Sequence, residues 1–564
     1  MDLTYACSSK IESLTKGPES IVYGYDGKLI TSETLAGTLN QTLSYTYNND
    51  FNLSSMTYAG ATDSFSYDND GLLTNVGSLT ISRYNDPGVN ETGLPYHVSN
   101  GNFNLNRSFN GYGETSSENT VVKSQDIYSW NVLARFDDGR IKTKTETLGG
   151  NTVTLDYTYD PMGRLATVTK DGSLVEEYDY SNLPYGTCTY QMNTSRGIAG
   201  RSLGYDDEEH LLSTEDTDYQ YDLDGFLQYK TLSAGTTYYE YSTRGELLSV
   251  DLPDNTTIEY VYGPLGRRIA KKINGTIVEK YLWSGLTTLL AIYDGSDNLV
   301  MRFKYADSRM PVALEKAGVI YYLAYNQVSS LRAVADAAGN IVKQIDYDSF
   351  GFVLNDTNPG FEVPFGFAGG LYDRDTGLVR FGYRDYDPDA GRWTAKDPIG
   401  FAGGDSDLYG YCLNDPINLV DPWGLEWDLV SSTQAFHAGA TPVSDRFSKN
   451  NTNQSNSSYS PTLKSNNEYQ GYAYFHPEYN LMNHHPTYTG PDLSPLVDNV
   501  AYLGRGIPET TILGVNDTSS AYTEQIVWSF CYVFIWGVNV GSGYDAPPFY
   551  PAFQPRETNS NACE

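Results

Sequence analysis

Two aspartates are the residues of this chain whose type and spacing best suit chemistry. Asp397 and Asp421 each begin an Asp-Pro-x-Gly motif, and 20 residues separate the two motifs. When a fold brings two carboxyl groups together, ionising both costs free energy because the charges repel. One group therefore keeps its proton while the other acts as a base. Such a pair can activate water for peptide hydrolysis without a metal and without a Ser or Cys nucleophile.

The same motif is also a signal for a tight turn. Pro398 and Pro422 fix φ, and Gly400 and Gly424 supply a position with positive φ. On this second interpretation, both aspartates are ordinary turn residues that end a β-rich plug. The motif alone leaves both interpretations open, so the elements that hold it matter.

Those elements are indicated by an internal repeat. The repeat consists of an aromatic residue, any residue and then a Tyr, with a Gly four positions after the Tyr. Neighbouring copies lie about 20 residues apart. The copies are Phe65–Gly71, Tyr157–Gly163, Tyr219–Gly225, Tyr239–Gly245 and Tyr260–Gly266, with an Ile variant at Ile345–Gly351. This period suits a β-hairpin better than a pair of helices.

Each copy of the repeat predicts one hairpin. Side chains alternate along a strand, so the two rings lie on one face. An Asp after the Tyr can hydrogen-bond the turn backbone, and the Gly takes positive φ. A Leu two residues after the Gly, such as Leu165 or Leu247, lies on the returning strand and is expected to face the rings. Because one hairpin is marginal alone, neighbours must stack into a long β-sheet.

Composition excludes several classes of protein. The net charge of −33 repels phosphates, so we do not expect the repeat region to bind nucleic acid. Five Cys without a CxxC pair argue against a disulfide framework or a zinc site, and we predict neither a metal nor a cofactor. The apolar run Ile526–Val540 is short for a membrane helix, and we predict no transmembrane segment. The first residues lack the features of a secretory signal.

The stretch around the two motifs resembles the core of a known family. Residues 377–393 read GLVRFGYRDYDPDAGRW, and both Asp-Pro-x-Gly copies follow before residue 425. This order is similar to the C-terminal core of Rhs (rearrangement hotspot, YD-repeat) proteins, and the repeats are similar to those of Tc-toxin C subunits. The resemblance implies an all-β fold: YD repeats wind into a complete or partial hollow shell, the core closes it as a plug, and a variable C-terminal domain follows.

The resemblance also implies roles for individual residues. Asp397 and Asp421 would be the acid pair of a self-cleaving, aspartyl-protease-like segment, and the bond that is cut would be Leu425–Glu426. Arg392 matches a family arginine that orients a carboxylate or lowers its pKa.

Two departures from the family pattern add alternatives. The two motifs lie one residue farther apart than is commonest, with the extra residue within 404–407, so Asp405 and Asp407 are alternative catalytic residues. Glu426 adds a third carboxylate at the bond, which would raise a neighbouring pKa or slow the cleavage.

We therefore expect three parts: a YD-repeat shell at 1–375, the core at 376–425 and a variable region at 426–564. The stretch 431–467 is rich in Ser, Asn and Thr and is predicted to be flexible. The leading hypothesis is a toxin carrier whose shell encloses residues 426–564 as an effector and frees them by cleavage after Leu425. It is expected to be exported or exposed at the cell surface. Further expected partners are an immunity protein and a partner that completes or delivers the shell.

The alternative hypothesis is an uncleaved YD-repeat protein of the cell surface, structural or adhesive, that binds carbohydrate or protein. The C-terminal region does not decide between the two. Four histidines there could serve an effector site or could be loop residues. They are His437, His476, His484 and His485.

Overall fold

The computed structural model describes residues 2–5, 10–84, 92–180 and 186–430, together with the strands β42 (Val500–Tyr502) and β43 (Leu513–Val515). The predicted flexible stretch 431–467, the four C-terminal histidines and the apolar run after residue 525 lie outside the described residues. The chain divides into two units, Thr38–Thr441 and a second unit that contains Met1–Gly37. None of the described helices is long and apolar enough to cross a membrane.

The N-terminal strands form an antiparallel series in chain order. They are β1 (Asp2–Tyr5), β2 (Ile11–Lys16), β3 (Glu19–Asp26) and β4 (Leu29–Ala36).

Within Thr38–Thr441, two long series of strands carry the repeats, and each strand pairs antiparallel with the next one in the chain. The first series is β5 (Gln41–Tyr47), β6 (Leu53–Tyr58), β7 (Ala61–Tyr67), β8 (Leu73–Val76), β9 (Leu79–Arg83), β10 (Pro95–Ser99), β11 (Phe103–Phe109), β12 (Thr115–Val122), β13 (Gln125–Arg135), β14 (Ile141–Leu148), β15 (Asn151–Tyr159), β16 (Leu165–Lys170), β17 (Ser173–Tyr180), β18 (Cys188–Asn193) and β19 (Ile198–Ser202). The second is β20 (Gly204–Tyr205), β21 (Leu211–Ser213), β22 (Asp218–Tyr221), β23 (Leu227–Leu232), β24 (Gly235–Tyr241), β25 (Leu247–Asp251), β26 (Thr257–Tyr262), β27 (Arg268–Ile273), β28 (Thr276–Ser284), β29 (Thr288–Asp294), β30 (Leu299–Lys304), β31 (Ala313–Lys316), β32 (Val319–Tyr325), β33 (Leu331–Asp336), β34 (Ile341–Tyr347) and β35 (Val353–Asp356). We call these two series the wall.

The segment after the wall, which we call the core segment (residues 357–430), has short strands and short 3-10 helices. They are η2 (Phe367–Gly369), β36 (Leu371–Tyr372), β37 (Val379–Phe381), β38 (Arg384–Asp387), β39 (Arg392–Trp393), η3 (Gly400–Gly403), η4 (Cys412–Asn414), β40 (Leu419–Val420) and β41 (Asp428–Leu429); a further 3-10 turn, η1 (Thr194–Arg196), lies in the wall. The prediction of an all-β chain built from stacked hairpins is confirmed, whereas the division at residues 375 and 425 stays a prediction.

The repeat turn has the chemistry that the sequence predicts. In the copy at β15, Oδ1 of Asp160 accepts the backbone N–H groups of Met162 and Arg164 at 2.9 Å each. The N–H of Gly163 donates to the carbonyl of Asp160 at 3.0 Å, and Gly163 has a φ of 91°. The Leu that follows, Leu165, is fully buried. One aspartate therefore satisfies a turn that only Gly enters without strain.

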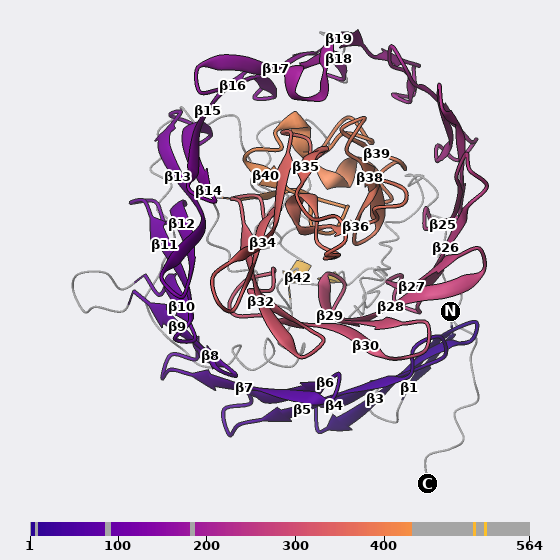
Figure 1. Cartoon of the computed structure of the whole chain (residues 1–564). Helices are drawn as coiled ribbons and strands as arrows, with labels where there is room; N and C mark the ends of the chain where they lie inside the picture. Colours follow the sequence, from indigo (N-terminus) through magenta and orange to yellow (C-terminus); the bar gives the residue numbers. More distant parts are fainter. Residues whose placement is uncertain are drawn as a thin grey trace. The chain divides into compact units, whose positions relative to one another are not determined.

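A feature of the repeat that the sequence did not reveal is a β-bulge at the Tyr itself. The strand register shifts between Thr158 and Tyr159, and the same shift recurs immediately before Tyr221, Tyr241 and Tyr262. A bulge bends its strand and increases the local twist. Repeated bulges therefore account for the curvature of the wall, and Figure 1 shows the strands from β7 to β26 following an arc.

The core segment lies on the inner side of this arc and is bound to the wall (Figure 1). Asn418 accepts the N–H of Ile141 on β14 at 2.8 Å, and Asp373 accepts the hydroxyl of Tyr260 on β26 at 2.6 Å. Contacts from strands this far apart in the sequence fix the position of the core segment within the unit.

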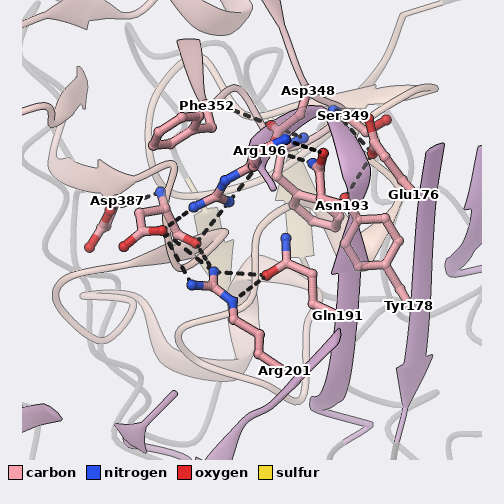
Figure 2. A network of polar contacts seen from close by, with 12 residues as sticks. Glu176, Tyr178, Gln191, Asn193, Arg196, Arg201, Asp348, Ser349, Phe352 and Asp387 are labelled. Carbon is pink, nitrogen blue, oxygen red and sulfur yellow. Dashed lines mark hydrogen bonds and ion pairs between the residues drawn. The ribbon is translucent and has the colours of Figure 1, made fainter. Parts of the chain in front are cut away.

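A network of polar side chains strengthens this attachment (Figure 2). Arg196 and Arg201 from the wall both pair with Asp389 of the core segment. Arg196 also lies 3.5 Å from Asp348, which in turn accepts the amide of Asn193 at 3.0 Å. The core segment is thus attached to the wall through buried, mutually oriented charges.

Candidate active site

Arg384 brings Asp397 and Asp421 together. Its Nη2 lies 2.8 Å from Oδ2 of Asp397 and 3.2 Å from Oδ2 of Asp421, and all three side chains are buried. The two aspartates of the repeated motif therefore flank one guanidinium nitrogen, although 24 positions separate them in the chain. A shared cation offsets the repulsion between two adjacent carboxylates.

Three contacts fix the position of Arg384 at the start of β38. Its Nε donates to the carbonyl of Gly424 at 2.6 Å, and its guanidinium lies 4.2 Å from the ring centroid of Trp393. The neighbouring Tyr383 donates its N–H to the carbonyl of Trp423 at 2.8 Å. The turn before β38 therefore packs directly on the second Asp-Pro-x-Gly motif.

The ring of Trp393 belongs to an aromatic cluster that supports the site. Its rings lie with centroids 4.7 to 6.2 Å apart in the recorded pairs. The cluster consists of Phe367, Phe381, Tyr386, Trp393 and Tyr411. A rigid apolar support of this kind fixes the rotamers of the polar residues above it.

The bond predicted to be cut lies between the two aspartates. The N–H of Leu425 donates to Oδ1 of Asp421 at 3.0 Å. A methyl group added at Gly403 would lie 2.5 Å from the carbonyl oxygen of Leu425 and 2.7 Å from Oδ2 of Asp397. The carbonyl of Leu425 and the carboxyl of Asp397 are therefore close neighbours across a glycine that leaves the space between them open.

A small cavity joins these groups. Asp397, Asp405, Asp421, Leu425 and Glu426 all line it. The centre of a water molecule can occupy a volume of about 10 Å³ in this cavity, which leaves room for about one water molecule. The reactant that hydrolysis requires therefore has a place beside the bond.

Burial raises the pKa of both aspartates. The pKa of Asp397 rises to about 6, because desolvation and the charge of Asp421 outweigh Arg384. The pKa of Asp421 is also raised by burial, while Arg384 and the N–H groups of Leu425 and Gly424 oppose that rise. A pair with raised pKa values holds a proton close to neutral pH, as acid–base catalysis needs.

The residue after the predicted cut adds a third carboxyl group. Burial, followed by the charges of Asp428, Asp421 and Asp397, raises the pKa of Glu426 to about 7. The pKa of Asp428 rises to about 6, again chiefly through burial. Below these values, the carboxyl groups downstream of the bond are neutral and do not repel the charge on Asp397 and Asp421.

Arg392 pairs with one of the alternative aspartates, Asp407. It forms a bidentate pair with Asp407, with distances of 2.6 and 2.8 Å, and donates to the carbonyl of Glu209 at 2.9 Å. Asp407 in turn accepts the N–H of Tyr409 at 3.0 Å. Arg392 thus orients the loop that carries Asp407, and it is Arg384 that reaches the Asp-Pro-x-Gly pair.

Asp405, one of the alternatives, also lines the cavity. Its Oδ2 is buried and has no hydrogen-bond partner among the described residues. Burial and the charge of Asp407 raise its pKa to about 7. Its catalytic role stays a prediction, and so do the roles of Asp397, Asp421, Arg392 and Asp407.

Sequence reasoning missed Arg384 and Gly403. Arg384 stands within the stretch that carries the family resemblance, but Arg380 and Arg392 stand there too, and spacing does not reveal which one reaches the aspartates. Gly403 follows the first motif without any distinguishing pattern. Within the described ranges, no group of three or more His, Cys, Asp or Glu side chains could hold a metal ion.

The comparisons with known proteins identify the fold family. The sequence profile of the Teneurin YD-shell family matches residues 8–417. The chain belongs to this family. The resemblance to Rhs-type YD-repeat shells is thereby confirmed.

The curated relatives of this YD-shell are much longer proteins. Teneurin-3 of Danio rerio is 27% identical over 425 residues, which cover 71% of this chain and 15% of that protein. Human teneurin-4 is 28% identical over 398 residues, which cover 67% of this chain and 14% of that protein. The chain therefore spans about one seventh of the length of these relatives.

Solved structures of Tc toxins are also similar to this chain. The crystal structure of TcdB2-TccC3 is 17% identical, has a TM-score of 0.48, and matches 75% of this chain and 24% of that chain. The Photorhabdus luminescens Tc holotoxin pore is 16% identical, has a TM-score of 0.48, and matches 77% of this chain and 24% of that chain.

Proposed function

We propose that this YD-shell cuts its own chain at the Leu425–Glu426 bond and so releases the segment that follows. The observation that carries the proposal is that Arg384 holds Asp397 and Asp421 at that bond. Holding the bond within the same chain adds the advantage of intramolecular positioning.

The positions of the two carboxyl groups suggest their roles. Protonated Asp397, next to the carbonyl oxygen of Leu425, donates its proton to that oxygen. Ionised Asp421 takes a proton from a water molecule in the cavity, and the water oxygen attacks the carbonyl carbon. The tetrahedral intermediate then collapses. The C–N bond breaks as Asp421 gives its proton to the nitrogen of Glu426, and a hydroxyl group of the intermediate returns a proton to Asp397.

In the described region, the segment after the cut forms a short β-ladder with the chain before it. Strand β41 pairs with β40 through Leu419 with Leu429 and Val420 with Asp428, and the N–H of Val430 donates to the carbonyl of Asn418 at 2.9 Å. Such a short pairing supports a role as releasable cargo for residues 426–564, with the wall as its carrier. An immunity protein and a partner that completes or delivers the shell belong to this proposal.

The second candidate function is an uncleaved shell that binds a partner at the cell surface. The similarity of residues 8–417 to the teneurin shell favours it. Both functions require that the protein be exported or exposed at the cell surface. They differ in whether the Leu425–Glu426 bond is broken.

The experiment that tests the proposal compares Asp397→Asn and Asp421→Asn with the wild type on a denaturing gel. We expect two fragments from the wild type and one full-length chain from each variant, because Asn can neither donate the carboxyl proton nor act as the base. Asp415→Asn is the matched control. Asp415 is a buried core-segment aspartate whose pKa is raised to about 7, but it does not line the cavity, so cleavage should persist. A single full-length chain, without fragments, in all four proteins would exclude self-cleavage and favour the surface shell.

A further inference from the structure

A second cavity in the same unit is lined by an unusual number of arginines. Four arginines line it, from the wall and from the core segment, and we call it the arginine cavity. They are Arg267, Arg268, Arg309 and Arg380. None of the residues that line it, all of them described, is Asp or Glu.

The four guanidinium groups share very little negative charge. Asp385 pairs with Arg268 at 2.8 Å and with Arg380 at 2.7 Å, and it is the one carboxylate among the described residues in a direct ion pair with any of the four. Arg267 donates to the carbonyl of Trp283 at 3.3 Å, and Arg309 donates to the carbonyl of Ala368 at 2.8 Å. These two contacts are to neutral oxygens, so the cavity carries a surplus of positive charge.

Several of the N–H donors have no acceptor. Nε of Arg268, Nε of Arg380 and Nη2 of Arg380 are buried without a hydrogen-bond partner in the part of the chain that the structure describes. The two residues are 4% and 5% exposed, so water cannot readily satisfy these donors. Buried donors of this kind are rarely left unpaired, because desolvating them without an acceptor costs free energy.

Charge and burial together indicate what is missing. Burial lowers the pKa of the Arg309 guanidinium, whereas Tyr262 and Asp385 raise the pKa of Arg268 against the effect of burial. An anion in the cavity would supply both the negative charge and the acceptor oxygens. Planar guanidinium groups bind phosphate and similar oxyanions through paired N–H donors.

The size of the cavity limits the anion. The centres of water molecules can occupy a volume of about 30 Å³ in this cavity, which leaves room for about two or three water molecules. That space admits one small ion and excludes a nucleotide or a sugar phosphate. We propose that the arginine cavity binds one small tetrahedral oxyanion, phosphate or sulfate.

Such an ion would join the wall to the core segment. Arg268 begins β27 of the wall, whereas Arg380 lies on β37 and Pro422 belongs to the second Asp-Pro-x-Gly motif, and all three line the cavity. A bound oxyanion would therefore bridge the wall and the core segment beside that motif. This inference does not depend on self-cleavage, since a cut and an uncut chain contain the same four arginines.

The test is equilibrium dialysis of the full chain against inorganic phosphate and, separately, against sulfate, with chloride holding the ionic strength constant. We expect saturable binding of one anion per chain. Arg380→Gln and Arg267→Gln should each weaken the binding at least about tenfold, because each removes a charged donor from the cavity. Arg267 has no ion pair among the described residues, so its variant is the one more certain to fold.

Arg332→Gln is the matched control. Arg332 is a buried wall arginine that pairs with Glu146 and Asp346 and does not line the cavity, so its removal should leave anion binding unchanged. An ion trapped since folding would not exchange during dialysis. We would therefore also denature the purified chain in acid and measure the released phosphate and sulfate by ion chromatography. No bound anion by either measurement, or equal binding in the wild type, Arg380→Gln and Arg267→Gln, would overturn the proposal.

Discussion

At the scale of single residues, the site depends on one arginine that contacts both aspartates. The motif alone does not select Asp397 and Asp421, because Asp160–Gly163 in the wall is a third copy of it. The surrounding stretch that resembles the Rhs core singles them out. The choice of Arg384 over Arg392 is not contained in the spacing of the motifs. It depends on the turn before β38, which directs Arg384 onto the second motif, while Arg392 on β39 meets Asp407.

Arg384→Lys should slow cleavage by at least about tenfold. Lysine keeps the positive charge but cannot contact both carboxylates and the carbonyl of Gly424 with one planar group. The rate can be followed by mixing denatured, uncut chain into refolding buffer and sampling on gels. A conservative variant of an arginine outside the site, Arg332→Lys, should cut at the wild-type rate. An unchanged rate in Arg384→Lys would show that the contact with both aspartates is not used.

Gly403→Ala should block cleavage while leaving the shell folded. The added methyl group would lie under 3 Å from both the Leu425 carbonyl oxygen and Oδ2 of Asp397, so it must push the acid away from the bond. Gly111→Ala is the control, because a methyl group there meets nothing within 4 Å. Circular dichroism would establish folding, and a gel would report the cut. Normal cleavage by folded Gly403→Ala would contradict the placement of Asp397.

At the scale of elements, tyrosine hydroxyl groups link several strands of the wall to an earlier strand. The hydroxyl groups of Tyr159, Tyr180 and Tyr305 donate to the backbone carbonyls of Ile141, Leu165 and Leu289, at 2.9, 2.7 and 2.6 Å. The sequence predicts the strands, the turns and the shared apolar face, because these depend on local chemistry. It does not predict the bulge or this bond, since both depend on how neighbouring hairpins stack.

Tyr305→Phe should lower the stability of the wall by about 1 kcal/mol, because the carbonyl of Leu289 loses its buried donor while the ring packing remains. The shift would be measured as the midpoint of urea unfolding. Tyr112, which is 94% exposed, provides the control, and Tyr112→Phe should leave the midpoint unchanged. An equal midpoint for Tyr305→Phe and the wild type would mean that the hydroxyl bond does not stabilise the stack.

At the scale of the whole molecule, buried acids make stability depend on pH. Burial is the main cause that raises the pKa of seven carboxyl groups to about 6 or 7 in the described part of the folded chain. They belong to Glu209, Asp348, Asp397, Asp405, Asp415, Glu426 and Asp428. The unfolded chain, with ordinary pKa values near 4, binds fewer protons than the folded chain between about pH 4.5 and 7.

The free energy of unfolding should therefore fall as the pH rises from 5 to 8. Each group contributes up to about 1.4 kcal/mol for each pH unit within its window, and the fall should end above the folded pKa values. Urea unfolding at a series of pH values measures the slope, and Asp415→Asn should make it shallower. A stability that rises over this range would contradict the protonated state of these groups.

The central claim is that the chain is cut at one bond, and the intact mass of the purified wild-type protein tests it most directly. We predict two polypeptides whose masses correspond to residues 1–425 and 426–564, meeting at Leu425–Glu426. A single species with the full mass of 62.6 kDa, unchanged after incubation at pH 5 to 8, would contradict the claim and leave the YD-shell as an uncleaved scaffold.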